Sequence, residues 1–304
     1  MKKLTLFVLS LGLMFGAMAQ NFGTVRSVVS ADRTPVKPIM LTQGNVNAKT
    51  ATVSDVEWFI DDQYQDFEVN YNITVDQDCQ VATGIFLAGD VDGLAEYNNM
   101  TAEEVVYAFA TQYAAFGYNF VSEVQAGTYQ CNAYCEMFLS SYSLAPSTDY
   151  EIVVLEIVGQ EMTLTRHEVT SESLGGNGTA VATITLSNIN SYKADIDVEV
   201  NDQTNYFFFL FGETDQLEGY EMNDLAELCE SQYFTKYIAD LSGYLGDEDP
   251  DGENALQPAT SYTAVAIPFN ANKVMGTCDS KTFTTTNTVS LNDIESVSVS
   301  VYPN

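Results

Sequence analysis

The chain has 304 residues, of which 42 are acidic and 11 are lysine or arginine, and its formal net charge is −31. A chain this acidic repels nucleic acid and anionic membrane surfaces, which excludes both as expected partners. The same excess of carboxylates makes divalent cations the first ligand class to consider, because these are hard oxygen ligands.

Residues 1–19 have the pattern of a secretory signal peptide. Lys2 and Lys3 precede an apolar run over 4–15, and small residues stand at Ala17 and Ala19. We expect cleavage between Ala19 and Gln20, which takes the formal charge from −31 to −33. No other stretch approaches the roughly 18 consecutive apolar residues of a transmembrane span. The sequence therefore predicts an exported protein, secreted or at the cell surface, without a transmembrane span.

Residues 20–49 differ from the rest of the chain in charge. They hold four basic residues, with Asp32 as the only acid, and contain Pro35, Pro38 and Gly44. We interpret this segment as a leader or linker, with the first compact unit beginning near residue 50.

A short phrase occurs twice in the chain. Residues 144–150 read LAPSTDY and residues 256–262 read LQPATSY, 112 residues later. Upstream, GDVDGLAEY at 89–97 aligns with GETDQLEGY at 212–220 at an offset of 123. The two offsets predict two copies of one unit, at 50–170 and 171–287. The first copy has extra residues, which we place at 125–135.

Alternating apolar and polar residues predict strands in both copies. Residues 66–76 alternate in the first copy and residues 194–200 in the second. The runs that follow, 81–88 and 205–212, are almost continuously apolar, as central strands of a sandwich are. Two closing strands follow each repeated phrase.

Each copy also has one segment with helical spacing, after a turn that begins GD or GE. The first, over 100–117, starts at Thr101 with Glu104 three residues on, which is a capping box. The second, over 222–241, has Asn223 as its expected N-cap.

The phrase Leu-x-Pro-x-Thr-x-Tyr, followed by an alternating strand, resembles the sixth-strand corner of a fibronectin type III domain. The resemblance implies that the tyrosine hydroxyl bonds to the backbone a few residues upstream, and that the motif has a structural role. It implies two tandem fibronectin type III or immunoglobulin-like β-sandwiches, each with an inserted α-helix, like repeats in secreted bacterial surface proteins. Neither copy has the usual tryptophan on its second strand. The corner residues are Leu144, Pro146, Thr148, Tyr150, Leu256, Pro258, Thr260 and Tyr262.

Residues 288–304 supply a second resemblance. A Ser/Val-rich run ends in Val301, Tyr302, Pro303 and Asn304. This ending is similar to the opening of a type IX secretion sorting domain, so we expect a linker followed by the start of a truncated sorting tail.

One acidic loop has part of a calcium-binding pattern. Asp247, Asp249 and Asp251 stand at positions 1, 3 and 5, and Gly252 at position 6. Pro258 occupies position 12, where a bidentate glutamate is usual. A calcium site and a solvated acidic loop are the two interpretations.

Five cysteines allow disulfides in an exported chain, although an odd number leaves one unmatched. By position, Cys79 would pair with Cys131 or Cys135, and Cys229 with Cys278. The alternative is that most are buried apolar thiols.

His167 is the single histidine, which removes most routes to acid–base catalysis at neutral pH. We therefore expect a non-enzymatic binding, adhesion or spacer protein whose partner is a protein or glycan at a cell surface, with no cofactor apart from the calcium considered above. One alternative is an accessory region of a larger exported protease or glycosidase. Another is a carbohydrate-binding module that uses tyrosines within 129–134 or 242–246.

Overall fold

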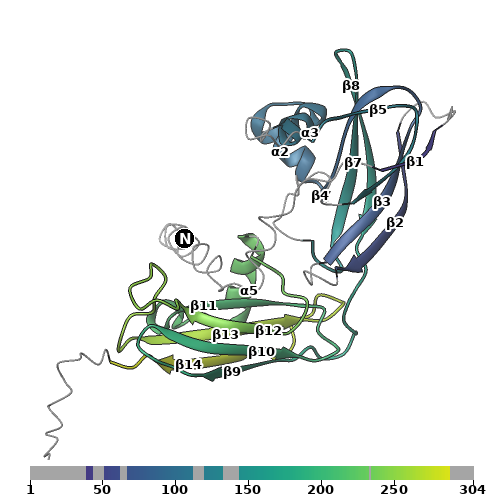
Figure 1. Ribbon diagram of the computed structural model, residues 1–304. Helices are drawn as coiled ribbons and strands as arrows, with labels where there is room; N and C mark the ends of the chain where they lie inside the picture. Colours follow the sequence, from purple (N-terminus) through teal and green to yellow (C-terminus); the bar gives the residue numbers. More distant parts are fainter. Residues whose placement is uncertain are drawn as a thin grey trace, which may run out of the picture.

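The computed structural model describes residues 39–43, 51–61, 67–111, 120–132, 144–232 and 234–287. These residues form two β-sandwiches, one after the other along the chain (Figure 1). The predicted fold class, mainly β with tandem sandwiches, is confirmed. We refer to the sandwiches as module 1 and module 2.

Module 1 has two antiparallel sheets of four strands each. In spatial order, the strands of the first sheet are β1 (Ile39–Gln43), β6 (Gly127–Asn132), β3 (Phe67–Val75) and β2 (Thr52–Ile60). Those of the second are β5 (Ser122–Val124), β4 (Cys79–Leu87), β7 (Asp149–Val158) and β8 (Glu161–Thr170).

Module 2 has two antiparallel sheets of three strands. The first contains β12 (Leu241–Gly246), β10 (Lys193–Val200) and β9 (Ala182–Ser187). The second contains β11 (Tyr206–Glu213), β13 (Ser261–Phe269) and β14 (Asp279–Thr284).

The two modules share one strand order. The strands β2, β3 and β6 correspond to β9, β10 and β12, and β4, β7 and β8 correspond to β11, β13 and β14. This is the A-B-E and C-F-G arrangement of immunoglobulin-like sandwiches. The chain is thus a duplicated sandwich with fibronectin-like strand order.

The period of the strands explains which faces are buried. On β3 the alternating residues Val69, Tyr71 and Ile73 are fully buried between the sheets. On β11 both faces are buried, because Phe207 and Phe209 point into the sandwich while Phe208 and Leu210 point to the other side. The near-continuous apolar run that predicted a central strand is therefore covered from both sides.

Helices cover the second sheet of each module on its outer face. In module 1, α2 (Asp90–Asn98) and α3 (Ala102–Thr111) form an apolar layer with β4 and β7. In module 2, α5 (Met222–Ser231), after the short α4 (Thr214–Leu217), packs on β11 and β13. The expectation of one helix per copy was wrong, because the GD and GE segments expected to be turns begin helices themselves.

Helix capping agrees with the sequence in one module and differs in the other. At α3 the Thr101 hydroxyl accepts the Glu104 N–H at 3.2 Å and the Glu104 carboxylate accepts the Thr101 N–H at 2.8 Å, as predicted. At α5 the N-cap is Glu221, paired with Asp224 in a capping box, and not Asn223. The helix also ends at Ser231, halfway through the predicted range.

The extra residues of module 1 are not where the sequence suggested. The range 125–135 contains β6, which corresponds to β12 and is therefore common to both copies. Module 1 instead gains residues between α3 and β6, where β5 adds an edge strand beside β4. The second sheet of module 2 has no such strand among the described residues.

Candidate functional site

The repeated phrase forms the same corner in both modules. The backbone N–H of Ala145 donates to the Tyr150 hydroxyl at 2.8 Å, and the N–H of Gln257 donates to the Tyr262 hydroxyl at 2.9 Å. Both tyrosines are buried, and burial raises the pKa of each. Each hydroxyl therefore stays protonated and serves as a neutral acceptor.

The other motif residues complete the corner. Leu144 and Leu256 are buried at 4% and 6% exposure. The Thr148 hydroxyl donates to the Pro146 carbonyl at 3.0 Å, and Thr260 donates to the Pro258 carbonyl at 3.1 Å. All eight residues lie in structural positions at the start of β7 and β13.

In each module, a serine or threonine hydroxyl outside the motif makes two further hydrogen bonds to the corner, and we call this hydroxyl the brace. Ser171 accepts the Thr148 N–H at 2.9 Å and donates to the Ala145 carbonyl at 2.7 Å. In module 2, Thr285 accepts the Thr260 N–H at 3.0 Å and donates to the Gln257 carbonyl at 2.6 Å. The repeated motif alone did not predict this pair. The sequence feature that could have indicated it is a serine or threonine directly after the last strand of each module.

The corner of module 1 lies at the joint between the modules. Asn205, which is fully buried just before β11, accepts the N–H groups of Leu174 and Gly175 at 2.7 and 3.2 Å. Its Nδ2 donates to the Ser147 hydroxyl at 3.1 Å. One side chain of module 2 thus holds both the corner of module 1 and residues 171–180, which connect the modules and which we call the linker.

The linker passes so close to module 2 that glycine is required. A Cβ on Gly175 would lie 2.5 Å from the backbone nitrogen of Asn205, which is closer than atoms approach. A Cβ on Gly176 would collide with the Gln203 side chain. The glycine run that the sequence showed between the copies is therefore packed against module 2 and does not act as a free tether.

An apolar contact also crosses the joint. Ile238, between α5 and β12, packs against the buried core of module 1 and against the helix-side core of module 2. The core of module 1 contains Trp58, whose ring stacks on Phe67 at 5.3 Å and lies 5.8 Å from Tyr150. The joint therefore combines a buried amide with an apolar contact.

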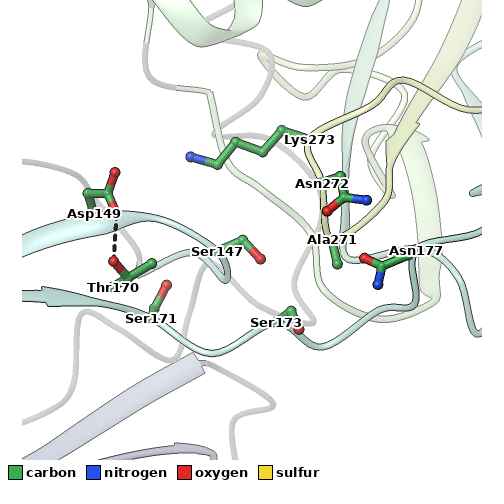
Figure 2. Close-up of a pocket in the computed structure, with 9 residues that line it drawn as sticks. All are labelled: Ser147, Asp149, Thr170, Ser171, Ser173, Asn177, Ala271, Asn272 and Lys273. Atoms are coloured by element: carbon green, nitrogen blue, oxygen red, sulfur yellow. Dashed lines mark hydrogen bonds between the residues drawn. The ribbon is translucent and has the colours of Figure 1, made fainter.

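A polar groove of about 490 Å³ opens at this joint. Module 1 contributes Ser147, Asp149 and Thr170, the linker contributes Ser171, Ser173 and Asn177, and module 2 contributes the loop at 271–273. Asp149 accepts a hydrogen bond from the Thr170 hydroxyl at 2.7 Å. Lys273 extends from the module 2 loop toward the side on which Asp149 lies (Figure 2).

The groove offers hydrogen bonds and two opposite charges. Its hydroxyls and amides suit a polar ligand, and the described residues that line it include no aromatic ring to stack on a sugar. The Ser147 and Ser171 hydroxyls are already engaged in the joint and the corner. The joint is the candidate functional site because residues of both modules and the linker meet only there in the described part of the chain.

The acidic loop holds its aspartates in local turns. The Asp249 N–H donates to Asp247, and the Asp251 N–H donates to Asp249, each at 3.0 Å. Within the described ranges no three Asp, Glu, His or Cys side chains gather as a metal-ligand set. The carboxylates of Asp247 and Asp249 thus accept backbone N–H groups of their own loop.

The cysteine pairing was wrong where the structure describes it. Cys79, Cys229 and Cys278 are free thiols, so neither Cys79–Cys131 nor Cys229–Cys278 is bonded. Cys131 is buried inside module 1, and Cys135 lies outside the described residues. Burial raises the pKa of the Cys79 thiol to about 11 and raises those of Cys229 and Cys278. These thiols are protonated and behave as apolar groups.

Two buried carboxylates lie on β7 of module 1. Glu151 lies 3.5 Å from the Arg166 guanidinium, which also binds Asp92 in the first turn of α2 at 2.7 and 2.9 Å. Glu156 accepts the Ala51 N–H at 2.9 Å. Burial raises the pKa of both glutamates. Their contacts fix α2 and the start of β2.

The tyrosines within 129–134 and 242–246 that were considered for stacking on a sugar make contacts within the protein where the structure describes them. Tyr129 is buried at 4% exposure, and its hydroxyl donates to the Gln125 carbonyl at 2.9 Å. Tyr244 on β12 is half-buried, with the Lys193 ammonium 4.5 Å from its ring centre. Tyr134 lies outside the described residues. The two described rings are engaged within the protein.

No protein-family model matches the chain, and no curated protein matches it. Among solved structures, the FN1–FN3 domains of chicken CNTN1 are similar at 11% identity and a TM-score of 0.23, over 72% of this chain and 60% of that one. The glycoside hydrolase domain of Endo-D from Streptococcus pneumoniae R6 is similar at 9% identity and a TM-score of 0.24, over 77% and 37%. The chain thus spans less than two thirds of either structure.

The strand order and the two corners define the class as a tandem β-sandwich protein with fibronectin-like topology. Helices in the described part of the chain are all too short or too polar to cross a membrane.

Proposed function

We propose that the protein is an exported, non-enzymatic cell-surface or extracellular protein whose two sandwiches act as a stiff spacer that carries binding surfaces. The observation that supports this most directly is Asn205, which joins the linker and the corner of module 1 in one buried amide. Ile238 adds an apolar contact across the same joint. Interfaces between domains of one chain usually allow domain motion unless they are well packed. The buried hydrogen bonds of Asn205 therefore favour a fixed angle between the two modules.

The sandwich architecture fits a non-catalytic accessory module. The described thiols favour their protonated form, because burial raises their pKa values, and the groove offers hydrogen-bonding groups. A spacer of this kind would hold its binding surfaces in a constant geometry toward a protein or glycan partner at a cell surface.

Small-angle X-ray scattering of the chain from Gln20 to Asn304 tests the stiffness. We expect one narrow distribution of dimensions, which broadens in the double variant Asn205→Ala/Ile238→Ala. Two matched controls leave Asn205 and Ile238 in place. Asn177→Ala removes an amide that lines the groove, and Ile189→Ala removes an apolar side chain packed only on the module 2 core.

A natural chain that already samples a broad range of dimensions would overturn the spacer role. Export is tested separately by expressing the full chain in a Gram-negative host and recovering it outside the cytoplasm. N-terminal sequencing of that product is expected to begin at Gln20.

A further inference from the structure

The strands β6 and β12 occupy equivalent positions in the two modules. Each is antiparallel to the second strand of its sheet, β6 to β3 and β12 to β10, on the side away from β2 or β9. In the immunoglobulin arrangement the neighbour on the free side of this strand is strand D. The two modules therefore offer the same edge to a further strand.

In module 1 this edge is covered by a strand from the leader. β1 is antiparallel to β6, with Ile39 opposite Gln130 and Gln43 opposite Gly127. A segment that precedes the whole sandwich thus takes the position of strand D. The segment that pairs at this edge in module 1 is short and extended, with the sequence IMLTQ.

In module 2 the same edge is open. Among the described residues, β12 makes backbone ladder contacts with β10 alone, from Lys193 opposite Gly246 to Val198 opposite Leu241. This ladder has no register shift, and the strand LSGYLG has no lysine or proline. Bulges, charged side chains and prolines are the devices that normally prevent an edge from pairing. β12 lacks all three.

Charge around β12 favours a basic segment. Asp195 and Asp197 on β10 lie opposite Tyr244 and Ser242. The loop that follows β12, residues 247–253, carries five acids. An antiparallel strand beside β12 would place its N-terminal end next to this loop. In the leader, Arg33 and Lys37 precede β1 on that N-terminal side.

We propose that the outer edge of β12 is a β-augmentation site for an extended segment of a partner protein, with cationic residues just before the added strand. Added strands gain affinity from main-chain hydrogen bonds and specificity from flanking side chains. The inference rests on the open edge and does not depend on the stiffness of the joint.

Hydrogen–deuterium exchange tests the site with a synthetic peptide of residues 33–49 as the probe, added to the chain from Gln20 to Asn304. We expect exchange to slow at the amides of 241–246 and to stay unchanged at the edges formed by β9 and β14. A peptide with Met40→Pro/Thr42→Pro, the two positions that pair with β6 on either side of the bulge at Leu41, is expected to lose this protection.

Charge variants test the flanking preference without altering β12. Glu248→Lys/Glu253→Lys reverses two exposed acids of the loop and is expected to weaken peptide binding by roughly fivefold. Glu161→Lys/Glu168→Lys, two exposed acids on β8, is the matched control and should leave binding unchanged. Absence of protection at 241–246, or protection confined to β6 through exchange with β1, would overturn the proposal.

Discussion

The Tyr150 hydroxyl lies 2.8 Å from the backbone nitrogen of Ala145, and its counterpart, the Tyr262 hydroxyl, lies 2.9 Å from the nitrogen of Gln257. Each hydroxyl satisfies an N–H of the loop that enters β7 or β13. In module 1, where Ala145 is buried, an N–H without this acceptor would cost stability.

Replacing a corner tyrosine with phenylalanine is expected to destabilise its module. Tyr150→Phe leaves the buried Ala145 N–H without an acceptor, which costs about 1–3 kcal/mol of unfolding free energy. Tyr262→Phe acts in the same direction. Urea denaturation measures both, by Trp58 fluorescence for module 1 and circular dichroism for the whole chain. Tyr97→Phe, at 88% exposure, is the control. An equal effect of all three changes would contradict the corner role.

The brace hydroxyl of Ser171 is expected to stabilise module 1 about as much as the Tyr150 hydroxyl does. Ser171→Ala removes the acceptor of the Thr148 N–H and the donor to the Ala145 carbonyl, so we expect a loss of about 1–3 kcal/mol. Ser171→Thr should retain most of the stability, because module 2 uses Thr285 in this role. Thermal denaturation compares the three chains. A threonine variant as unstable as the alanine variant would rule out a hydroxyl brace.

Ala259 is in the left-handed region, with φ of 53°. A side chain is unfavourable there, so Ala259→Gly is expected to raise the unfolding free energy of module 2 by about 0.5–1 kcal/mol. Ala264→Gly, in the middle of β13, should instead lower it by about 1 kcal/mol. Urea denaturation followed by circular dichroism distinguishes them. Destabilisation by both changes would mean that the strain at Ala259 is negligible.

Glu156 is expected to make the stability of module 1 depend on pH. Burial raises the pKa of its carboxyl above the ordinary value of a glutamate, so folding favours the protonated form. This contribution is present below the unfolded pKa and is lost as pH rises through the folded pKa. The unfolding free energy of the natural chain should therefore fall with rising pH relative to Glu156→Gln.

The comparison with Glu156→Gln needs a matched change of charge, because the whole chain is strongly acidic. Glu168→Gln removes the same charge from an exposed position on β8. Urea denaturation of the three chains from pH 4 to pH 7 provides the measurement. Parallel curves for the natural chain and Glu156→Gln would refute the prediction.

The sequence predicted those parts of the fold whose partners lie close together along the chain. The strand alternation, the Thr101–Glu104 capping box and the tyrosine corners each depend on residues within about one turn or corner of one another. Asn223 failed as an N-cap because Glu221, two residues earlier, is the N-cap and forms a capping box with Asp224. At GDVDG, Gly89 in the left-handed region starts α2 where a turn was expected.

By itself, then, the sequence determined that the chain is a duplicated β-sandwich with a corner in each copy, because period and local hydrogen bonds are written in consecutive residues. The tertiary structure decided the rest. Ser171 reaches Thr148 from 23 residues away, and Asn205 reaches Ser147 from 58. Only folding brings such groups together. The same holds for β1, which precedes β2 in the chain but pairs with β6, whereas the equivalent edge of β12 has no second strand among the described residues.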